Sequence, residues 1–523
     1  MRVGVYNKHW ATAGGGEKYA ASMAIALRDG NEVTLLGNDA IDTAMLEERL
    51  QVDLSGMATV DLGPDPGAAS EASADYDLFV NASYGSDEPN RANHGLYVVY
   101  FPSGAHPGIQ GVDRAAVRIL DPIARPHGAV VRWGRGFWAR DSGAVFSWTA
   151  GRAVIYVEAA DGLEVPLHLA FGGHRPEAAG PTVARIAVEG EPVATVLVEP
   201  GRRRASVDVP VRGRGPKHPV AVEIRADTFV PAELGMGDDR RQLGVPLTRA
   251  AIGPRFGSAR SLGQWGIARL AQRVRPNVNL LQSIRFLDSY DRLVSISDYT
   301  TLWTKRFWDR DSVLLHPPVT PQPRGAGGKD NMILSVGRFF APEHGHSKKQ
   351  LEMVNGFRLL CEGGLTGWEY HLVGGCKPED EHYLNDVRAA AEGLPVVFHI
   401  GASGAELRDL YSRASIFWHA SGLGEDPARN PVRYEHFGIT TVEAMSAGIV
   451  PIVIGMAGQL EVLESGVEGY HFQTLDELVA RTREVAGDET LRRRLADAAV
   501  ARAAQFSPEC FADRLGEIVA TLG

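Results

Sequence analysis

The sequence predicts an α/β protein of two parallel-sheet domains, with an all-β sandwich inserted into the first of them. Short apolar runs that alternate with helical patterns occupy both ends of the chain, as in parallel sheets covered by helices. Between them, helical periodicity fades and short alternating runs are separated by Gly/Pro turns, which is typical of a sandwich. A length of 523 residues suggests about three domains. The predicted parts are residues 1–110 with 256–320, the inserted sandwich at 111–255, residues 321–505, and a C-terminal helix at 506–523 that returns to the first domain.

The composition limits the classes of function. The chain has 44% hydrophobic and 23% charged residues, as a soluble globular protein does. Its formal net charge of −10 argues against a general nucleic-acid binder. No apolar run reaches the ~18–20 residues that span a bilayer, and residues 1–8 have the pattern of a strand instead of a signal peptide. The three cysteines are scattered and indicate neither a disulfide framework nor a metal cluster, so we expect a cytoplasmic protein.

The first domain begins with a strand followed by a glycine run. Its strand candidates are residues 3–6, 33–36, 76–80, 96–101 and 313–318. The run Gly14-Gly15-Gly16-Glu17-Lys18 follows the first strand and precedes a helical pattern. Such a turn lets phosphate or sugar approach the backbone closely, which makes Gly15 and Gly16 candidate binding residues. A glycine run can also simply make the turn, so this signal is weak by itself.

The second domain follows a Pro- and Gly-rich linker at residues 320–329. Its strand candidates are residues 332–336, 370–373, 396–401, 416–420 and 449–453. Open parallel sheets bind ligands at the carboxyl ends of their strands. The residues that fall just after such ends are Arg338, Gly374, Gly401, Ser421 and Glu435. Because they come from separate strands, their convergence is stronger evidence for a site than any one of them.

The stretch from Tyr434 to Met445 carries the strongest chemical signal. Glu435 and Glu443 are separated by seven residues, and Gly438 between them lets the backbone approach a ligand. Thr440-Thr441 is predicted as the N-cap of a short helix, whose free N–H groups and dipole favour phosphate. A carboxylate accepts two hydrogen bonds at once, which suits a pair of sugar hydroxyls. A phosphate site beside a polyol site indicates a nucleotide sugar. In the alternative interpretation there is no ligand site: Glu443 is a helix-capping acid and Glu435 is a solvated loop residue.

The string Glu435-His436-Phe437-Gly438-Ile439-Thr440-x-x-Glu443-Ala444-Met445 resembles the donor motif of retaining glycosyltransferases of family 4. These enzymes have the GT-B fold of two Rossmann-like domains, and the resemblance implies that fold here. It implies that Glu435 holds hydroxyls of the transferred sugar and that Glu443 holds the ribose diol. It also implies that the backbone of Phe437, Gly438 and Ile439 binds the diphosphate and that the base lies near Gly374 and Gly401. Gly15 and Gly16 would face the donor from the other domain, across the cleft between the two.

Side chains of the protein are expected to meet the charge on the leaving diphosphate. The resemblance assigns Arg338, at a strand end, and Lys348, on the following helix, to this role. Arginine offers a planar fork and lysine a compact charge, so both suit a phosphate. Their spacing is longer than the family's usual one, which leaves Lys349 as an alternative to Lys348. The run Glu379-Asp380-Glu381 is predicted to begin a helix instead of forming a metal site, so we expect neither a metal nor another cofactor.

Aromatic residues leave two questions open. Where the family commonly carries a histidine before a Phe-Pro pair, this chain has Tyr100. In one interpretation the hydroxyl of Tyr100 donates a hydrogen bond to a sugar oxygen. In the other, Tyr100 is a buried strand residue without contact to the sugar. In the sandwich, Trp133, Trp138 and Trp148 either stack on sugar rings or pack in the core. The sandwich itself is predicted to serve acceptor binding or oligomerisation.

Residues 260–310 carry nine Lys/Arg against four Asp in a chain that is acidic overall. The apolar positions at approximately helical spacing are Trp265, Ile267, Leu270 and Val274. A basic amphipathic helix can lie on an anionic membrane surface, and the alternative is an ordinary domain helix with a solvated face. Peripheral contact with the inner face of a membrane is therefore one prediction.

The predicted function is retaining, metal-independent transfer of a hexose from a nucleoside diphosphate sugar to a glycan or lipid-linked acceptor. The His436-Phe437-Gly438-Ile439 variant and the triple glycine look like mannosyltransferases that use GDP-mannose, so GDP-mannose is favoured over a UDP-hexose. The alternatives are a nucleotide-sugar epimerase, a glycan phosphorylase of GT-B fold and a non-catalytic carbohydrate-binding scaffold. The predicted partners are the nucleotide sugar, the acceptor and, in a homo-oligomer, a second copy of the chain, but no nucleic acid.

Overall fold

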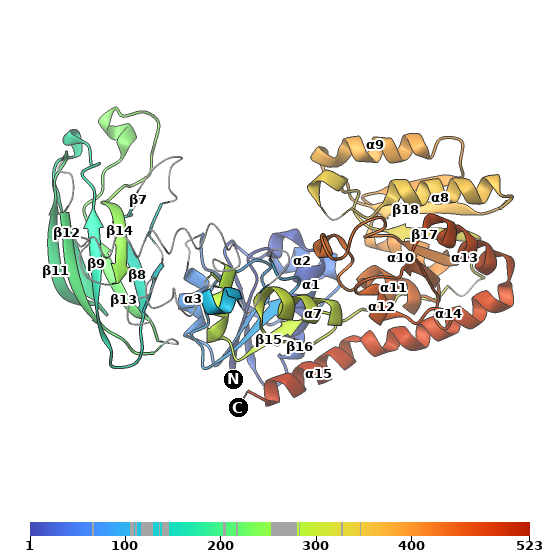
Figure 1. Cartoon of the computed structure of the whole chain (residues 1–523), viewed down its shortest axis with the longest axis horizontal. Helices are drawn as coiled ribbons and strands as arrows, with labels where there is room; N and C mark the ends of the chain where they lie inside the picture. Colours follow the sequence, from blue (N-terminus) through green and yellow to red (C-terminus); the bar gives the residue numbers. More distant parts are fainter. Residues whose placement is uncertain are drawn as a thin grey trace.

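The computed structural model contains three bodies in a row: two α/β domains side by side and an all-β module beyond the first (Figure 1). The described residues are 1–64, 67–104, 109, 112–116, 129–134, 136–138, 146–201, 205–215, 218–252, 280–281, 283–325, 328–345 and 347–522. The apolar helix face predicted between residues 265 and 274 lies outside these ranges. Within them, no helix combines the length and apolar character that crossing a membrane requires.

The N-terminal domain is built on a seven-stranded parallel sheet in the order β16-β15-β5-β4-β1-β2-β3. The strands are β1 (Arg2–Tyr6), β2 (Glu32–Gly37), β3 (Ala58–Asp61), β4 (Leu78–Asn81), β5 (His94–Val99), β15 (Arg292–Ser295) and β16 (Val313–Leu314). The helices include α1 (Gly15–Ala26), α2 (Thr43–Leu50), α3 (Ala68–Ser73) and α7 (Asp298–Trp308). Apolar clusters on both faces of the sheet explain why its inner strands are continuous apolar runs. The edge strand β3 has no counterpart among the predicted strands, because all four of its residues are exposed.

The all-β module consists of two antiparallel sheets, ordered β11-β10-β13-β8-β6 and β12-β9-β14-β7. The strands are β6 (Val130–Trp133), β7 (Ser147–Trp148), β8 (Arg152–Glu158), β9 (Glu164–Phe171), β10 (Thr182–Val188), β11 (Glu191–Val198), β12 (Ala205–Arg212), β13 (Val220–Arg225) and β14 (Pro246–Ile252). Alternate side chains of both sheets, among them Leu167, Leu169 and Ile224, are fully buried in one shared core.

The three tryptophans of this module contact the module itself. Trp133 meets Phe137 edge-to-face with 4.6 Å between ring centroids, and Trp148 meets Phe229 at 5.5 Å. The indole N–H of Trp138 donates a hydrogen bond of 3.0 Å to a backbone carbonyl. All three side chains are half-buried, so packing within the module is the observed arrangement.

The C-terminal domain is built on a six-stranded parallel sheet in the order β19-β18-β17-β20-β21-β22. The strands are β17 (Met332–Val336), β18 (Glu369–Gly374), β19 (Val396–Ile400), β20 (Ile416–His419), β21 (Val450–Ile454) and β22 (Tyr470–Phe472). The helices are α8 (Gln350–Glu362), α9 (Glu381–Ala390), α10 (Gly404–Arg413), α11 (Ile439–Ser446), α12 (Gln459–Val462), α13 (Leu475–Gly487) and α14 (Glu489–Ala503). From β17 the chain builds the sheet outward to one edge, and from β20 it builds toward the other. The strand order therefore reverses between β17 and β20, and such a switch point is where open α/β sheets bind ligands.

The last helix, α15 (Pro508–Ala520), runs back from the C-terminal domain to the N-terminal one (Figure 1). There Phe511 meets Tyr19 of α1 edge-to-face, with 5.4 Å between ring centroids. The chain thus crosses between the domains twice, near Val319 and just after Phe506. The backbone N–H of Val319 donates a hydrogen bond of 2.8 Å to the carbonyl of Phe506, so the two crossings lie side by side.

Candidate active site

An ion pair marks the switch point of the C-terminal sheet. Lys348 lies in the loop after β17, and Glu435 lies in the loop between β20 and α11. The lysine Nζ is 2.6 Å from the glutamate Oε2, and both side chains are about four-fifths buried. The structure therefore brings together two residues that the sequence places 87 positions apart.

A third side chain, His419, contacts the same carboxylate. It is the last residue of β20, it is buried, and its Nε2 is 3.1 Å from Glu435 Oε2. Because a carboxylate only accepts hydrogen bonds, Nε2 carries the proton in this contact. Sequence reasoning missed His419, although the rule that selected Ser421 at the end of the same strand also applies to it.

The two lysines have different partners. The Nζ of Lys349 is 3.1 Å from Glu425, which Arg433 also contacts. Burial acts to raise the pKa of Glu425, but these two cations outweigh it and hold the pKa below its ordinary value. The predicted placement of Lys348 on the helix is wrong. Lys349 has a left-handed backbone (φ +59°) and is the N-cap residue, so α8 begins only at Gln350 and Lys348 lies in the loop before it.

Arg338 lies two residues beyond the end of β17 and is exposed at the rim of the same strand end. Its guanidinium carbon is 5.7 Å from the centroid of the Phe340 ring. Its carbonyl accepts a hydrogen bond of 3.0 Å from the side chain of Gln350, which fixes the loop at its base. Arg338 thus follows the strand end that also leads to Lys348.

The second acid of the motif, Glu443, belongs to α11. The predicted N-cap at Thr440-Thr441 is wrong, because the helix begins at Ile439 and its N-cap is Gly438, whose φ of +112° is a conformation that glycine adopts readily. Glu443 accepts a hydrogen bond of 3.0 Å from the hydroxyl of Tyr411. Burial raises its pKa above the ordinary value, and its polar neighbours offset this only in part.

The N-terminal domain meets this helix directly. The ammonium of Lys18, on α1, lies 3.9 Å from Glu443. A Cβ built on Gly15 would lie 3.4 Å from the Cδ1 of Ile439. The Phe101 and His436 rings stack with 4.2 Å between centroids and 11° between planes. The motif and the glycine run therefore face each other where the two domains touch.

Tyr100 connects the end of β5 to α1. Its hydroxyl lies 2.9 Å from the carbonyl of Gly16 and 3.0 Å from that of Ala82. Burial raises the pKa of this phenol well above its ordinary value. The hydroxyl has one proton and two backbone acceptors for it, so the structure favours a packing role for Tyr100.

Two candidate glycines at the strand ends are explained by backbone packing. A Cβ on Gly374 would lie 2.1 Å from the carbonyl oxygen of Gly337 on the neighbouring strand end. Gly401 has a φ of +71°, and its N–H donates to the Gly374 carbonyl at 3.1 Å.

Asp380, from the acidic run, is buried and accepts a hydrogen bond from the backbone N–H of Ala341. Among the described residues, no cluster of three or more His, Cys, Asp or Glu has a metal-binding arrangement.

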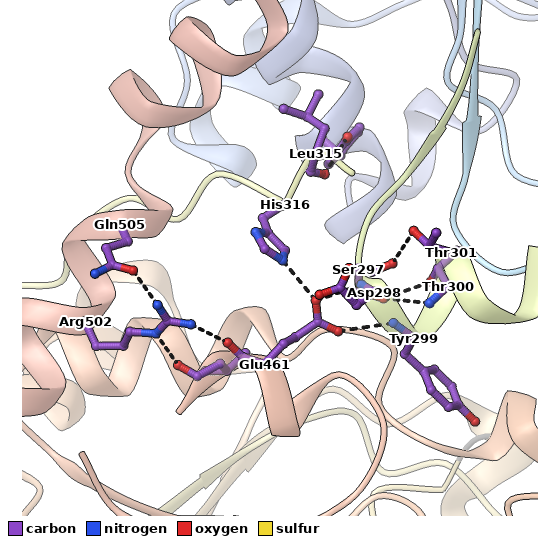
Figure 2. Close-up of polar contacts among 12 residues, drawn as sticks. Ser297, Asp298, Tyr299, Thr300, Thr301, Leu315, His316, Glu461, Arg502 and Gln505 are labelled. Atoms are coloured by element: carbon purple, nitrogen blue, oxygen red, sulfur yellow. Dashed lines mark hydrogen bonds and ion pairs between the residues drawn. The ribbon is translucent and has the colours of Figure 1, made fainter. Parts of the chain in front are cut away.

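A second acid of the C-terminal domain, Glu461 on α12, contacts the N-terminal domain (Figure 2). Its Oε2 accepts hydrogen bonds from the backbone N–H of Asp298 at 2.8 Å and from the Nε2 of His316 at 2.9 Å. Its Oε1 accepts from the backbone N–H of Tyr299 at 3.3 Å. Asp298 and Tyr299 begin α7, so Glu461 caps a helix of the other domain. Arg502 of α14 holds the carbonyl of Glu461 at 2.6 Å, which anchors the acid from behind.

Residues 319–502 match the family model described as glycosyl transferases group 1. A GDP-Man:Man(3)GlcNAc(2)-PP-Dol alpha-1,2-mannosyltransferase of Dictyostelium discoideum is 28% identical over 226 residues, covering 38% of this chain and 41% of the relative. A GDP-mannose:cellobiosyl-diphosphopolyprenol alpha-mannosyltransferase of Komagataeibacter xylinus is 29% identical over 174 residues, covering 32% of this chain and 39% of the relative. The matched part thus spans about two fifths of the length of these relatives.

Solved structures align with the chain along its length. Anabaena Alr3699/HepE in complex with UDP and glucose aligns with a TM-score of 0.50 at 11% identity, covering 100% of both chains. Sucrose-phosphate synthase of Thermosynechococcus elongatus aligns with a TM-score of 0.50 at 13% identity, covering 100% of this chain and 99% of the other. The predicted GT-B arrangement of two α/β domains is therefore confirmed at the level of fold. The part of the chain that matches the group 1 glycosyl transferase model, residues 319–502, contains the Lys348–Glu435 pair.

Proposed function

We propose that the chain is a retaining glycosyltransferase that moves a hexose from a nucleoside diphosphate sugar to a glycan or lipid-linked acceptor without a divalent metal. The observation that carries the proposal is the Lys348–Glu435 pair at the switch point of the C-terminal sheet. It sets a cation suited to phosphate beside a carboxylate suited to sugar hydroxyls. The match of residues 319–502 to group 1 glycosyl transferases supports the same assignment.

In the proposed mechanism, the diphosphate of the donor competes with Glu435 for the ammonium of Lys348. Lys348 and Arg338 then stabilise the negative charge that develops on the leaving group. Glu435 accepts hydrogen bonds from hydroxyls of the sugar, and the N–H groups at the start of α11 bind the diphosphate. The bond from the anomeric carbon to the phosphate oxygen breaks, and the acceptor oxygen bonds to that carbon on the same face. The departing phosphate takes the acceptor proton, so the anomeric configuration is retained.

The nucleoside is assigned to the other half of the motif. Glu443 is held by Tyr411 and faces Lys18, and in the proposal its carboxylate accepts the two ribose hydroxyls. The base is placed near Gly374 and Gly401, at the carboxyl ends of β18 and β19. Gly15 and Gly16 approach the donor from the N-terminal domain.

GDP-mannose is the favoured donor. The relatives from Dictyostelium and Komagataeibacter are named for GDP-mannose and for lipid diphosphate acceptors, and their matches support this choice. The Anabaena protein was crystallised with UDP and glucose, so a UDP-hexose is the competing donor.

The test is a donor panel with the full-length chain. GDP-mannose, UDP-glucose and further nucleotide hexoses are incubated with polyprenyl-diphosphate glycans and small glycosides, with magnesium or with EDTA, and the linkage formed is read by NMR. We expect transfer from GDP-mannose with retained configuration and equal rates in EDTA. Inversion, loss of activity in EDTA, or conversion of the donor to an epimer or a sugar phosphate would contradict the proposal.

For the all-β module we propose an accessory role in acceptor binding or oligomerisation. The module lies at the far end of the N-terminal domain from the C-terminal domain (Figure 1), away from the proposed chemistry. Replacing residues 112–255 with a short linker is expected to spare donor hydrolysis and to reduce transfer or the oligomeric mass measured by light scattering. Unchanged transfer with unchanged mass would contradict both roles.

A further inference from the structure

The end of strand β20 contacts Glu435 and the residue that precedes Lys348. Its last residue, His419, donates to Glu435. Two positions further, the hydroxyl of Ser421 donates a hydrogen bond of 3.2 Å to the carbonyl of Ser347, the residue before Lys348. We propose that His419 is a positioning residue for Glu435, which fixes one carboxylate oxygen so that the other faces the sugar. This inference rests on the proposed function.

Lys348 and His419, which both donate to Glu435 Oε2, differ in how freely their side chains can move. Lys348 reaches the oxygen from a loop, on a flexible side chain that is 23% exposed. His419 reaches it from β20, which pairs with β17 on one side and β21 on the other, and its side chain is only 4% exposed. The lysine is therefore free to change partners, whereas the histidine is held in place.

Binding of the nucleotide sugar makes this difference in mobility important. When the diphosphate draws the ammonium of Lys348 away, a carboxylate held by Lys348 alone would lose its orientation. The hydrogen bond from His419 Nε2 to Oε2 persists, because the imidazole does not move with the lysine. Oε1 then stays aimed at the sugar hydroxyls, and a misplacement on the order of 1 Å at such a group can cost ~10²-fold in rate.

The environment of His419 is built to hold it. Trp418, the residue before it, is buried in the core, and its carbonyl accepts a hydrogen bond of 2.9 Å from the hydroxyl of Ser335 on β17. This bond ties the two strands of the switch point together directly beneath the site. The backbone that carries the imidazole is therefore held in place, and the imidazole can orient Glu435.

The experiment compares two substitutions of His419 in the full-length chain. His419→Gln keeps an N–H donor near the position of Nε2, and His419→Leu removes it. Steady-state transfer is measured with GDP-mannose and with UDP-glucose. For His419→Leu we expect kcat to fall about 10- to 100-fold, with the donor KM within about threefold of wild type. For His419→Gln we expect kcat within about fivefold of wild type.

The matched control is His371 on β18, a buried strand histidine of the same sheet whose Nε2 lies 3.2 Å from a carboxylate oxygen of Glu369. His371→Leu removes a similar strand histidine with a carboxylate partner and is expected to leave kcat unchanged. Binding of GDP or UDP, followed by thermal shift, shows that each variant is folded. Wild-type kcat in His419→Leu, or equal losses in His419→Leu and His419→Gln, would overturn the inference.

A second readout does not depend on catalysis. The melting temperatures of His419→Leu, Glu435→Gln and the double variant are compared with that of wild type. A direct contact predicts that the shift of the double variant differs from the sum of the single shifts, whereas additive shifts would overturn the contact. If the wild-type chain transfers no sugar but the shifts are non-additive, the proposed function fails and the contact stands.

Discussion

Glu461 in the C-terminal domain accepts a hydrogen bond of 2.9 Å from His316, which lies just before the first crossing between the domains. The same carboxylate caps α7 of the N-terminal domain through two backbone N–H groups (Figure 2). An acid at the start of a helix is stabilised by the dipole and by the free N–H groups there. This capped contact therefore favours the arrangement in which the two domains touch.

Glu461→Gln is expected to weaken the contact between the domains. The amide carries no charge, so the hydrogen bonds to charged oxygen, worth about 1.5–3 kcal/mol each, become ordinary ones. Small-angle scattering should show a larger radius of gyration, and the donor KM should rise. The control is Glu464→Gln, which changes an exposed acid three residues away. Equal radii of gyration in Glu461→Gln and wild type would contradict this prediction.

Glu443→Gln is expected to raise the melting temperature at pH 7 while weakening nucleotide binding. Burial raises the pKa of Glu443 in the folded chain. Wild type therefore loses stability as the pH rises from the ordinary glutamate pKa of 4.5 through the raised value, and the glutamine variant does not. We expect the variant to be more stable than wild type at pH 7 and this difference to vanish below pH 4.5. Thermal scans of both proteins from pH 4 to 8, with the exposed Glu362→Gln as a control, measure it.

Lys348→Ala and Lys349→Ala are expected to affect different quantities. Lys348 is assigned to the leaving diphosphate, so its loss should cut kcat by ~10²-fold or more. Lys349 pairs with the mostly buried Glu425 and caps α8, so its loss should lower the melting temperature and leave kcat within a few-fold of wild type. Steady-state kinetics and thermal scans of both variants test the assignment. The reverse pattern would give the catalytic role to Lys349.

Tyr100→Phe is expected to lower stability by about 1 kcal/mol, the usual effect of losing one hydrogen bond. Its kcat should remain near that of wild type, because the hydroxyl is engaged by the carbonyls of Gly16 and Ala82. The exposed Tyr84→Phe is the control for the loss of a hydroxyl. A fall in kcat of ~10-fold or more would restore the alternative in which Tyr100 binds the sugar.

Much of the fold could be predicted because buried parallel strands leave a strong apolar signal. The runs that become β1, β2, β4, β17 and β20 were all evident from the sequence. The edge strands β3 and β22 were not, since β3 is exposed and β22 has only three residues. Short or solvated strands carry too few apolar residues to be distinguished from loops.

Part of the candidate site, whose role stays a prediction, could be proposed from the sequence. Glu435 and Glu443 are in one motif, and the resemblance suggested Arg338 and Lys348. The contact of His419 with Glu435 depends on the order of strands in the sheet, and that of Glu461 with α7 on how the domains meet. The φ of Gly438, which moves the start of α11, and that of Lys349, which moves the start of α8, are set by tertiary packing. Strand order, the contact between the domains and these backbone angles all depend on residues that are far apart in the sequence.

The hydrogen bond between Val319 and Phe506 has a mechanical consequence. Both covalent connections between the domains pass through this one point, so a relative rotation about it is opposed by noncovalent contacts such as those of Glu461, and not by a second covalent link. Such a rotation displaces atoms in proportion to their distance from the axis. A small angle there separates α1 from α11, which under the proposed function is how nucleotides would exchange, while the backbone at the two crossings stays nearly still.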